Sequence, residues 1–439
     1  MKLSSILGLN ARSQLFAYRY NPLKNKKIAD SKVRTASVLR KAGIPTPKIY
    51  KKFRDPRQVL EFDWNKLPSA FALKPSKGLG GEGIVVVKKR SEDGKGWITT
   101  QRKKITPEDL SLHALDIVEG AFSMTSEPDT ALVQEYVGRH KLLRKFAYRG
   151  TPDIRVIVFN KVPVMAMLRL PTKESGGRAN LHQGAIAVGI DIATGITTRA
   201  IWHGEQIVFK PGTKRKLRGI KIPDWTKVLE TAVGAQVASG LGYLGVDIVL
   251  HPELGPMVLE MNAQPGLQIQ MANAAGLRKR LDRVEDLEVR DPDHGVKIAK
   301  ALFSSRFSLR VKPEEGVKTV GAKEEIKILT DKKEKFKIFA KIDSGAWSSS
   351  IDRNLAKELG ILKKENILWY RKKLSSFGKE RRPVIPVTFW LSGKKIKTRM
   401  SVSNRVDLTY KVLIGRTDLG GFLIKPDLGS DEIETANKW

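Results

Sequence analysis

The sequence contains no cysteine among its 439 residues. This excludes disulfides and any zinc or iron–sulfur site with cysteine ligands. Histidine is also scarce, and none follows His294, so the last part of the chain offers no support for a zinc site of the usual kind. No apolar run reaches about 18 residues, and the N-terminal apolar patch is too short and interrupted for a signal peptide. We therefore expect a cytoplasmic protein without a transmembrane helix.

Acidic residues are few compared with basic ones: 46 Asp and Glu stand against 80 Lys and Arg, giving a net charge of +34. Balanced surface ion pairs, of the kind that lysine-rich thermophile proteins use, cannot absorb this excess. A field of this sign attracts nucleic acid, acidic peptides and nucleotides. Contact with a polyanion or nucleic acid is therefore expected from charge, although no recognisable nucleic-acid motif accompanies it.

Apolar periodicity and turn residues outline the elements of the first 308 residues. Helices are predicted over 28–42, with Ser31 as a cap, over 225–240 and over 292–306. Strands are predicted over 82–88, 131–137, 154–159 and 162–170, and a hairpin over 246–262. Residues 309–320 are polar and read as a linker. Short strands dominate residues 321–430, which predicts a small all-β domain followed by a tail, 431–439.

Residues 71–87, FALKPSKGLGGEGIVVV, place four glycines in six residues between two likely strands. Glycine loses more backbone entropy on folding than other residues, so such a cluster needs a structural reason. One reason is a flexible hairpin turn. The other is a loop whose backbone N–H groups surround a phosphate while Lys74 contributes charge.

Three oxygen-bearing residues, Asp247, Glu260 and Asn262, lie in the predicted hairpin. Residues two apart on a strand face the same side, so Glu260 and Asn262 can share one cation. The hairpin can bring Asp247 opposite them. Oxygen-only ligands suit Mg²⁺ or Mn²⁺ that bridges nucleotide phosphates.

These features occur within a longer series of motifs: DSK at 30–32, LKPSKGLGGEGI at 73–84, VQEYV at 133–137, DIRVIV at 153–158, GGRANLHQG at 176–184, and VDIVL with LEMNAQPGL up to 267. The series resembles the ATP-grasp superfamily, closest to its ribosomal-protein glutamate ligase branch. It is also similar to the glutamate-ligase-like proteins labelled sugar-transfer-associated. The resemblance implies an α+β ATP-grasp fold over residues 1–308. The α/β domain that usually precedes the nucleotide site is expected to be absent, because the motifs begin by about residue 20.

The resemblance also implies roles for individual residues. Those expected to bind ATP are Lys32 and Lys74 at the phosphates, Gly78, Gly80, Gly81 and Gly83 in the covering loop, and Gln134, Glu135, Tyr136 and Val137 at the adenine. Those expected to bind Mg²⁺ or Mn²⁺ are Asp247, Glu260 and Asn262. Those expected to contact the substrate carboxylate and the transferred phosphoryl group are Arg155, Arg169, Arg178 and Asn180. The implied reaction is carboxylate–amine ligation through an acyl phosphate, on glutamate or an acidic peptide.

Two motifs stand out in the second region: KIDSGAWSSS at 341–350 and YKVLIGRTDL at 410–419. An Asp-Ser-Gly-Ala turn followed downstream by apolar residues and Gly-Arg resembles the retropepsin-type aspartic protease fold, in the branch named ATP-dependent zinc protease. The resemblance implies a small all-β barrel with Asp343 as catalytic residue and a homodimer, since one chain supplies one aspartate of a dyad. Three alternatives stay open: trimming of the ligase product, a nucleotide-gated protease without ligation, and a non-catalytic peptide-binding regulator.

Overall fold

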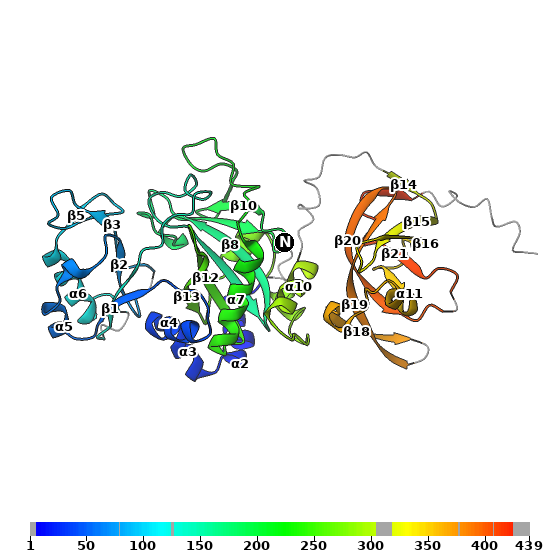
Figure 1. Cartoon of the computed structure of the whole chain (residues 1–439), viewed down its shortest axis with the longest axis horizontal. Helices are drawn as coiled ribbons and strands as arrows, with labels where there is room; N and C mark the ends of the chain where they lie inside the picture. Colours follow the sequence, from blue (N-terminus) through cyan, green and yellow to red (C-terminus); the bar gives the residue numbers. More distant parts are fainter. Residues whose placement is uncertain are drawn as a thin grey trace, which may run out of the picture. The chain divides into compact units, whose positions relative to one another are not determined.

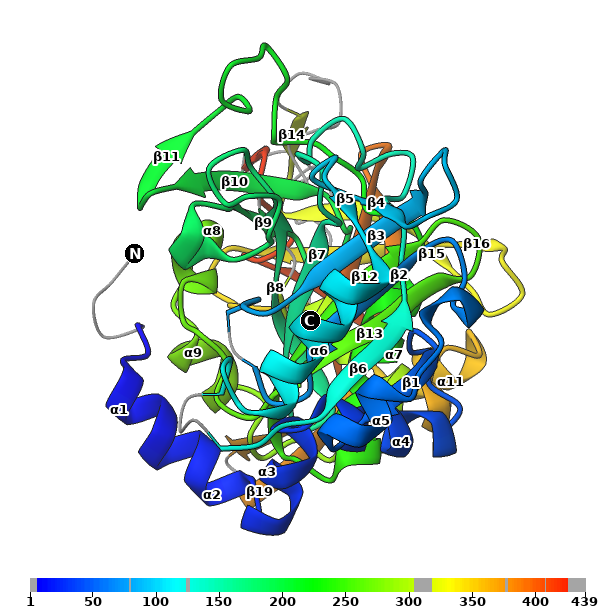
Figure 2. The ribbon, with the colours of Figure 1, turned by 90° about the vertical axis from the view of Figure 1, so that its left-hand side faces the viewer.

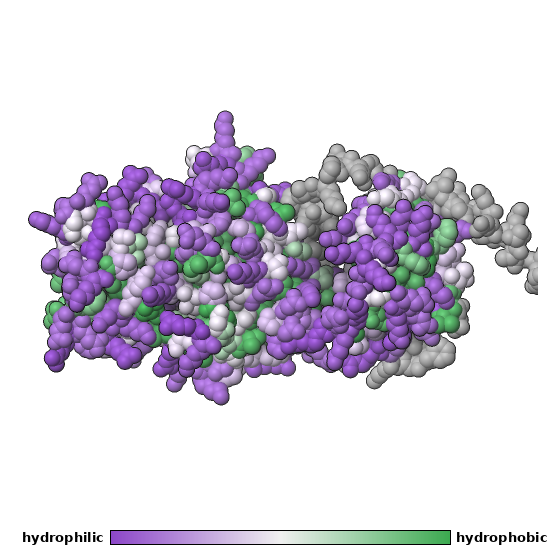
Figure 3. Space-filling view, in the orientation of Figure 1, coloured by the Kyte–Doolittle hydropathy of each residue, from purple (hydrophilic) through white to green (hydrophobic). Residues whose placement is uncertain are grey.

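The computed structural model describes residues 6–78, 80–123, 127–303, 318–375, 378–406 and 408–424. The chain divides into two units, residues 1–308 and 309–439 (Figure 1), which are described separately below. Residues 309–317 of the predicted linker and the predicted tail 431–439 lie outside the described residues. No helix in the described ranges is long and apolar enough to cross a membrane. The face shown in Figure 3 is largely hydrophilic, as the excess of Lys and Arg leads one to expect.

The first unit contains a six-stranded sheet in the order β1-β6-β2-β3-β4-β5. Its strands are β1 (Ile49–Phe53), β2 (Phe71–Pro75), β3 (Val85–Arg90), β4 (Trp97–Thr99), β5 (Lys104–Ile105) and β6 (Ala131–Glu135). Helix α6 (Pro107–Val118) lies against β2 and β6 (Figure 2) and contacts α5 (Pro56–Leu60). A capping box of Thr106 and Asp109 starts α6. Buried aromatic side chains fill the space between sheet and helices, Phe53, Trp64, Phe71 and Trp97 among them.

A seven-stranded sheet, in the order β11-β10-β9-β8-β7-β12-β13, forms the rest of this unit. Its strands are β7 (Asp153–Phe159), β8 (Val162–Leu170), β9 (Ile186–Ile190), β10 (Thr197–Trp202), β11 (Glu205–Ile207), β12 (Tyr243–His251) and β13 (Gly255–Asn262). Helices α7 (Trp225–Ser239), α8 (Ile269–Asn273), α9 (Arg278–Asp282) and α10 (Pro292–Leu302) pack on it. Eight of nine residues in β8 are buried, and the apolar residues run without alternation from Val162 to Leu168, before Arg169.

The predicted helix 28–42 covers the last two residues of α3 (Leu23–Ala29), a break, and all of α4 (Lys32–Lys41), which corrects the prediction. The cause is Ser31, whose backbone is extended and whose side chain accepts a hydrogen bond from Arg34 N, as predicted for a cap. A residue in this conformation ends one helix and begins the next. The chain before them forms α1 (Leu9–Arg12), a π-helical turn (Ser13–Ala17) and α2 (Tyr18–Tyr20).

The second unit is a closed barrel of six strands, in the order β15-β16-β21-β17-β20-β19, which closes because β19 also pairs with β15. These strands are β15 (Lys323–Leu329), β16 (Lys335–Asp343), β17 (Ser350–Asp352), β19 (Gly378–Leu391), β20 (Lys394–Ser403) and β21 (Val412–Gly415). Strand β18 (Trp369–Ser375) extends β19 outward, and α11 (Arg353–Glu358) packs on β17. Strands β14 (Lys318–Val320) and β22 (Phe422–Ile424) pair in parallel, so the last three residues of the predicted linker form a strand. The expected all-β barrel is confirmed.

Candidate active site

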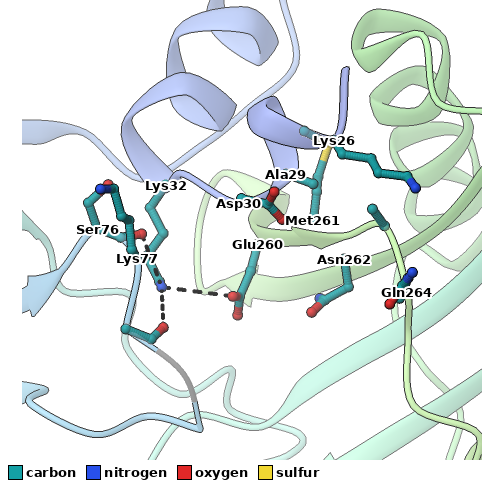
Figure 4. Close-up of a pocket in the computed structure, with 12 residues that line it drawn as sticks. Lys26, Ala29, Asp30, Lys32, Ser76, Lys77, Glu260, Met261, Asn262 and Gln264 are labelled. Atoms are coloured by element: carbon teal, nitrogen blue, oxygen red, sulfur yellow. Dashed lines mark hydrogen bonds and ion pairs between the residues drawn. The ribbon is translucent and has the colours of Figure 1, made fainter. Parts of the chain in front are cut away.

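A cavity of about 820 Å³ is lined by strands of both sheets of the first unit. It brings together most of the predicted residues: Lys74, Gly80, Gly81, Gln134, Glu135, Tyr136, Val137, Arg155, Arg169, Arg178, Asn180, Asp247, Glu260 and Asn262. A second cavity of about 340 Å³ is lined by Lys32 and Gly78 and shares Glu260 and Asn262 with the first (Figure 4). Gly83 lines neither cavity, because it lies beside the Phe122 ring and its carbonyl contacts His113.

The described part of the glycine loop needs its glycines for two different reasons. Gly80 and Gly81 have φ of +64° and +83°, in the left-handed region that other residues rarely adopt. A Cβ on Gly78 would lie 2.3 Å from Pro75 Cγ, so close packing requires glycine there. The loop is joined to the second sheet through Asn180, whose Nδ2 donates to Gly80 O at 2.9 Å. Asn180 therefore links the loop to the opposite side of the cavity.

Two lysine ammonium groups lie close to the loop. Lys74, on β2, is 4 % exposed and forms no ion pair with any described residue. Burial and the neighbouring Lys32 lower the pKa of Lys74 to about 7, although Glu260 acts in the opposite direction. Lys32, at the start of α4, donates to Gly78 O at 3.0 Å and lies 3.8 Å from Glu260 Oε1 (Figure 4). The pair concentrates positive charge where an anionic ligand would meet the loop.

Two arginines and two aspartates form a buried network across three neighbouring strands. Arg155 on β7 donates twice to Asp247 on β12, at 2.7 and 2.6 Å. Arg169 on β8 donates to Asp153 at 2.5 and 2.7 Å and to Asp247 at 2.8 Å. Bidentate pairing of this kind fixes both position and orientation. Burial alone would raise the pKa of Asp247, but the two guanidinium groups outweigh it and lower that pKa.

The hairpin β12–β13 has the predicted geometry, with Asp247 directly opposite Glu260. Glu260 and Asn262 both face the small cavity (Figure 4). Their side-chain oxygens, with those of Asp247, form the oxygen-only donor set that suits Mg²⁺. Glu260, whose side chain is 34 % exposed, and Asn262 can each offer an oxygen to the ion. Asp247 fits less well, because both of its carboxylate oxygens already contact arginines. Only two of the three are carboxylates, and the described residues contain no cluster of three acidic or histidine side chains around one point.

The segment predicted to meet adenine lines the cavity, but two of its side chains have other partners. Gln134 Nε2 donates to Pro47 O at 3.1 Å, and Glu135 accepts from Lys48 N at 2.9 Å. These bonds join the end of β6 to the chain that enters β1. The cavity wall continues along Tyr136 and Val137, where the Thr151 hydroxyl donates to Val137 O.

Two residues of the site were not predicted, Asp153 and Thr151. Asp153 faces the same side of β7 as Arg155, two positions away, and this spacing within the DIRVIV motif is the signal that identifies it. Burial raises the pKa of Asp153, and Arg169 opposes that shift. Thr151 precedes the strand, and nothing in its sequence context marks it.

Asp343 belongs to the second unit and has a different environment. It ends β16 opposite Gly415 of β21, and its Oδ1 accepts from the backbone N–H groups of Gly345 and Ala346, each at 2.9 Å. Beside this turn, Gly415 N donates a hydrogen bond to Ser349 Oγ, and the Ser349 hydroxyl donates one to the Asp418 carboxylate. The motif residues therefore form an ordered turn at one end of the barrel.

Residues 11–286 match the model of the sugar-transfer-associated ATP-grasp family, and the chain belongs to that family. It is 28 % identical over 207 residues to a probable alpha-L-glutamate ligase of Psychromonas ingrahamii, covering 46 % of this chain and 50 % of that protein. A probable alpha-L-glutamate ligase of Sodalis glossinidius is 31 % identical over 137 residues, covering 31 % and 32 %. The chain thus spans about half or less of the length of these relatives. Among solved structures, the ATP-grasp ligase PsnB with its minimal precursor superposes with a TM-score of 0.33 at 18 % identity, covering 61 % of this chain and 63 % of that one.

Proposed function

We propose that the first unit is an ATP- and Mg²⁺-dependent ligase that joins a carboxylate to an amine. The observation that carries this proposal is the convergence, on one cavity, of the glycine loop, Lys74 and the arginine–aspartate network, with Lys32 in the adjoining small cavity. Family membership supports the class of reaction. The predicted roles of Lys32, Lys74 and the glycines at ATP, and of Asp247, Glu260 and Asn262 at Mg²⁺, remain part of the proposal.

A carboxylate resists attack by an amine, because its carbon is a poor electrophile and oxide is a poor leaving group. In the proposed reaction a carboxylate oxygen takes the γ-phosphoryl group of ATP, and ADP leaves. The amine nitrogen then bonds to the acyl carbon while the carbon–oxygen bond to phosphate breaks. Of the two protons that the ammonium loses, one leaves with the phosphate and one passes to solvent.

The chain's own residues contribute charge and position to this reaction. Lys32 and Lys74 would hold the phosphates under the glycine loop, and Arg178 with Asn180 would close the opposite side. Arg155 and Arg169 are fixed by Asp247 and Asp153, so their remaining N–H groups are held in place for the substrate carboxylate or phosphoryl oxygens. Bound Mg²⁺ would neutralise phosphate charge beside Glu260 and Asn262.

We propose glutamate or an acidic peptide as substrate and the cytoplasm as location. The similarity to probable alpha-L-glutamate ligases supports the first, and the net charge of +34 favours acidic partners. Polyanion or nucleic-acid contact rests on charge alone.

The test is release of ADP and phosphate from Mg²⁺-ATP in the presence of amino acids and acidic peptides, with products identified by mass spectrometry. A product heavier by one amino-acid residue, formed by the wild type and not by Glu260→Ala, would establish the ligase. Lys24→Met, an exposed lysine on α3 outside both cavities, should behave as wild type. Turnover of ATP without any amide product would contradict the proposal.

A second candidate function belongs to the barrel, for which we propose a retropepsin-like fold that binds or cleaves peptides. The supporting observation is the Asp343 turn at the end of a closed barrel. Cleavage would require two chains, since one aspartate acts as base and the other as acid. Peptide shortening by the full chain that disappears in Asp343→Asn would support a peptidase, and a dimer in analytical ultracentrifugation should accompany it. Peptide binding that survives this change, without cleavage, would indicate the non-catalytic alternative. Cleavage that depends on ATP would indicate nucleotide gating.

A further inference from the structure

The small cavity lies beneath helix α3 and over the end of β13 (Figure 4). Its walls come from the end of α3, from Lys32 at the start of α4, from residues 76–78 and from residues 260–264. Glu260 and Asn262 separate it from the nucleotide cavity and line both. A molecule in the small cavity would therefore contact a phosphate held in the 820 Å³ cavity at this shared wall.

Two opposite charges, one on α3 and one at its C-terminal end, line this small cavity. Lys26 lies on α3 and Asp30 caps the C-terminal end of this helix, four residues later and therefore on the same side. Neither forms an ion pair with a described residue, and the Lys26 ammonium lies 4.5 Å from the centre of the Tyr18 ring. Figure 4 shows Lys26 extending along the side of Asn262 and Gln264, with Asp30 between Lys26 and Lys32. Burial raises the pKa of Asp30, and the charge of Lys26 opposes that shift, so the two groups act on each other across the cavity without contact. An ammonium and a carboxylate that face one space without forming an ion pair are complementary to a zwitterion.

We propose that the small cavity binds the amine substrate as a free α-amino acid, with its carboxylate at Lys26 and its ammonium at Asp30. This inference rests on the proposed ligase function and adds to it the class and the binding residues of the second substrate. The volume of about 340 Å³ suits one small molecule. In this orientation the amine points away from Lys26 toward Lys32 and the Glu260 part of the shared wall, where the acyl phosphate would form. The reaction itself, including its proton balance, is the one given above.

Isothermal titration calorimetry of the full chain with Mg²⁺ and a non-hydrolysable ATP analogue tests the site directly. The common L-amino acids are titrated first, and the best binder is then compared with its N-acetyl derivative, which lacks the ammonium, and with its decarboxylated amine. We expect Lys26→Met and Asp30→Asn each to weaken amino-acid binding about tenfold or more, the usual effect of losing one charge-assisted bond. Lys24→Met, on the same short helix, is the matched control and should bind as wild type.

The modified ligands distinguish the two contacts. Lys26→Met should not further weaken binding of the decarboxylated amine, because that ligand has no carboxylate to lose a contact. Asp30→Asn should likewise not further weaken binding of the N-acetyl derivative, which has no ammonium. Ala29→Leu adds volume to the same cavity without altering a charge, and should also reduce amino-acid binding while binding of the ATP analogue is retained. Thermal unfolding of each variant shows whether it is folded.

The possible outcomes separate this inference from the ligase proposal. Amide formation whose KM for the amino acid is unchanged in Lys26→Met, Asp30→Asn and Ala29→Leu would overturn the site and leave the ligase. Amide formation on peptide amines alone, with no free amino acid bound, would overturn it as well. Amino-acid binding that the variants abolish, in a protein that forms no amide, would support the site and overturn the ligase.

Discussion

The two units hold their central aspartates in different ways. In the first unit, Asp247 is 2 % exposed, and its carboxylate contacts two guanidinium groups. In the second unit, Asp343 is half-buried at a turn, and two backbone N–H groups hold it. A buried charge depends on opposite charges, whereas a carboxylate in contact with water needs only local hydrogen bonds. The first arrangement is therefore sensitive to the loss of any member, and the second tolerates such a loss.

Lys74 sharpens this comparison, because it is buried as deeply as Asp247 but has no ion-pair partner among the described residues. Its surroundings lower its pKa instead. Such a group is expected at a position where a ligand brings the missing opposite charge.

The largest effect is expected for Asp247→Ala. It leaves Arg155 and Arg169 buried without their shared partner, which should reduce the free energy of unfolding of the first unit by about 3–5 kcal/mol. Urea unfolding, with hydrogen exchange of the β7, β8 and β12 amides to assign the change to this unit, measures it. Glu260→Ala, directly opposite on the hairpin and partly exposed, is the control and should cost much less. Equal losses in the two variants would contradict the distinction between buried and exposed carboxylates.

Next in size, taken over one pH unit, is the pH dependence caused by Lys74. Its pKa is about 7 in the folded chain, against about 10.4 for an unperturbed lysine, so between these values the unfolded chain holds a proton that the folded chain lacks. The contribution of this group to the free energy of unfolding should therefore increase as pH rises across that window, by about 1.4 kcal/mol per pH unit. Chemical unfolding at several pH values should show a shallower rise for Lys74→Met.

The same group predicts a proton linked to ATP binding. Phosphate beside Lys74 favours its charged form, so binding at about pH 8 should take up part of one proton. Calorimetry in two buffers of different ionisation enthalpy measures this uptake, and Lys74→Met should remove it. Uptake that persists in the variant would place the titrating group elsewhere.

Much of this fold is predictable from the sequence, because local patterns determine it. Strand β8 matches its predicted bounds, 162–170, since an apolar run that only Arg169 interrupts lies between clear turn signals. The hairpin that sets Asp247 opposite Glu260 was predicted from two strand patterns around a short turn.

What escapes prediction depends on the order of strands in the sheet. The two-residue connection between β7 and β8 indicates a hairpin, which sets Arg169 opposite Asp153. The contact of Arg169 with Asp247 exists because β12 lies on the other side of β7, and no spacing along the chain reveals that order. The division into α3 and α4 was missed because periodicity continues across Ser31, although the cap itself was recognised. That division places Asp30 between the helices, at the edge of the small cavity.

The smallest effect is expected for Asp343→Ala. The substitution removes two hydrogen bonds that water can replace at this half-buried turn, so the free energy of unfolding of the barrel should fall by only about 1 kcal/mol. Hydrogen exchange of the β16 and β21 amides measures this change within the second unit. Asp352→Ala is the matched comparison: its carboxylate is 2 % exposed and accepts from Asn354 N, Leu355 N and Arg405 N. Asp352→Ala should reduce the free energy of unfolding more than Asp343→Ala, because it leaves buried N–H donors without an acceptor. If Asp343→Ala destabilises the barrel as much as Asp352→Ala does, the Asp343 carboxylate supports the fold, and its presence at the turn gives no argument for a role in chemistry.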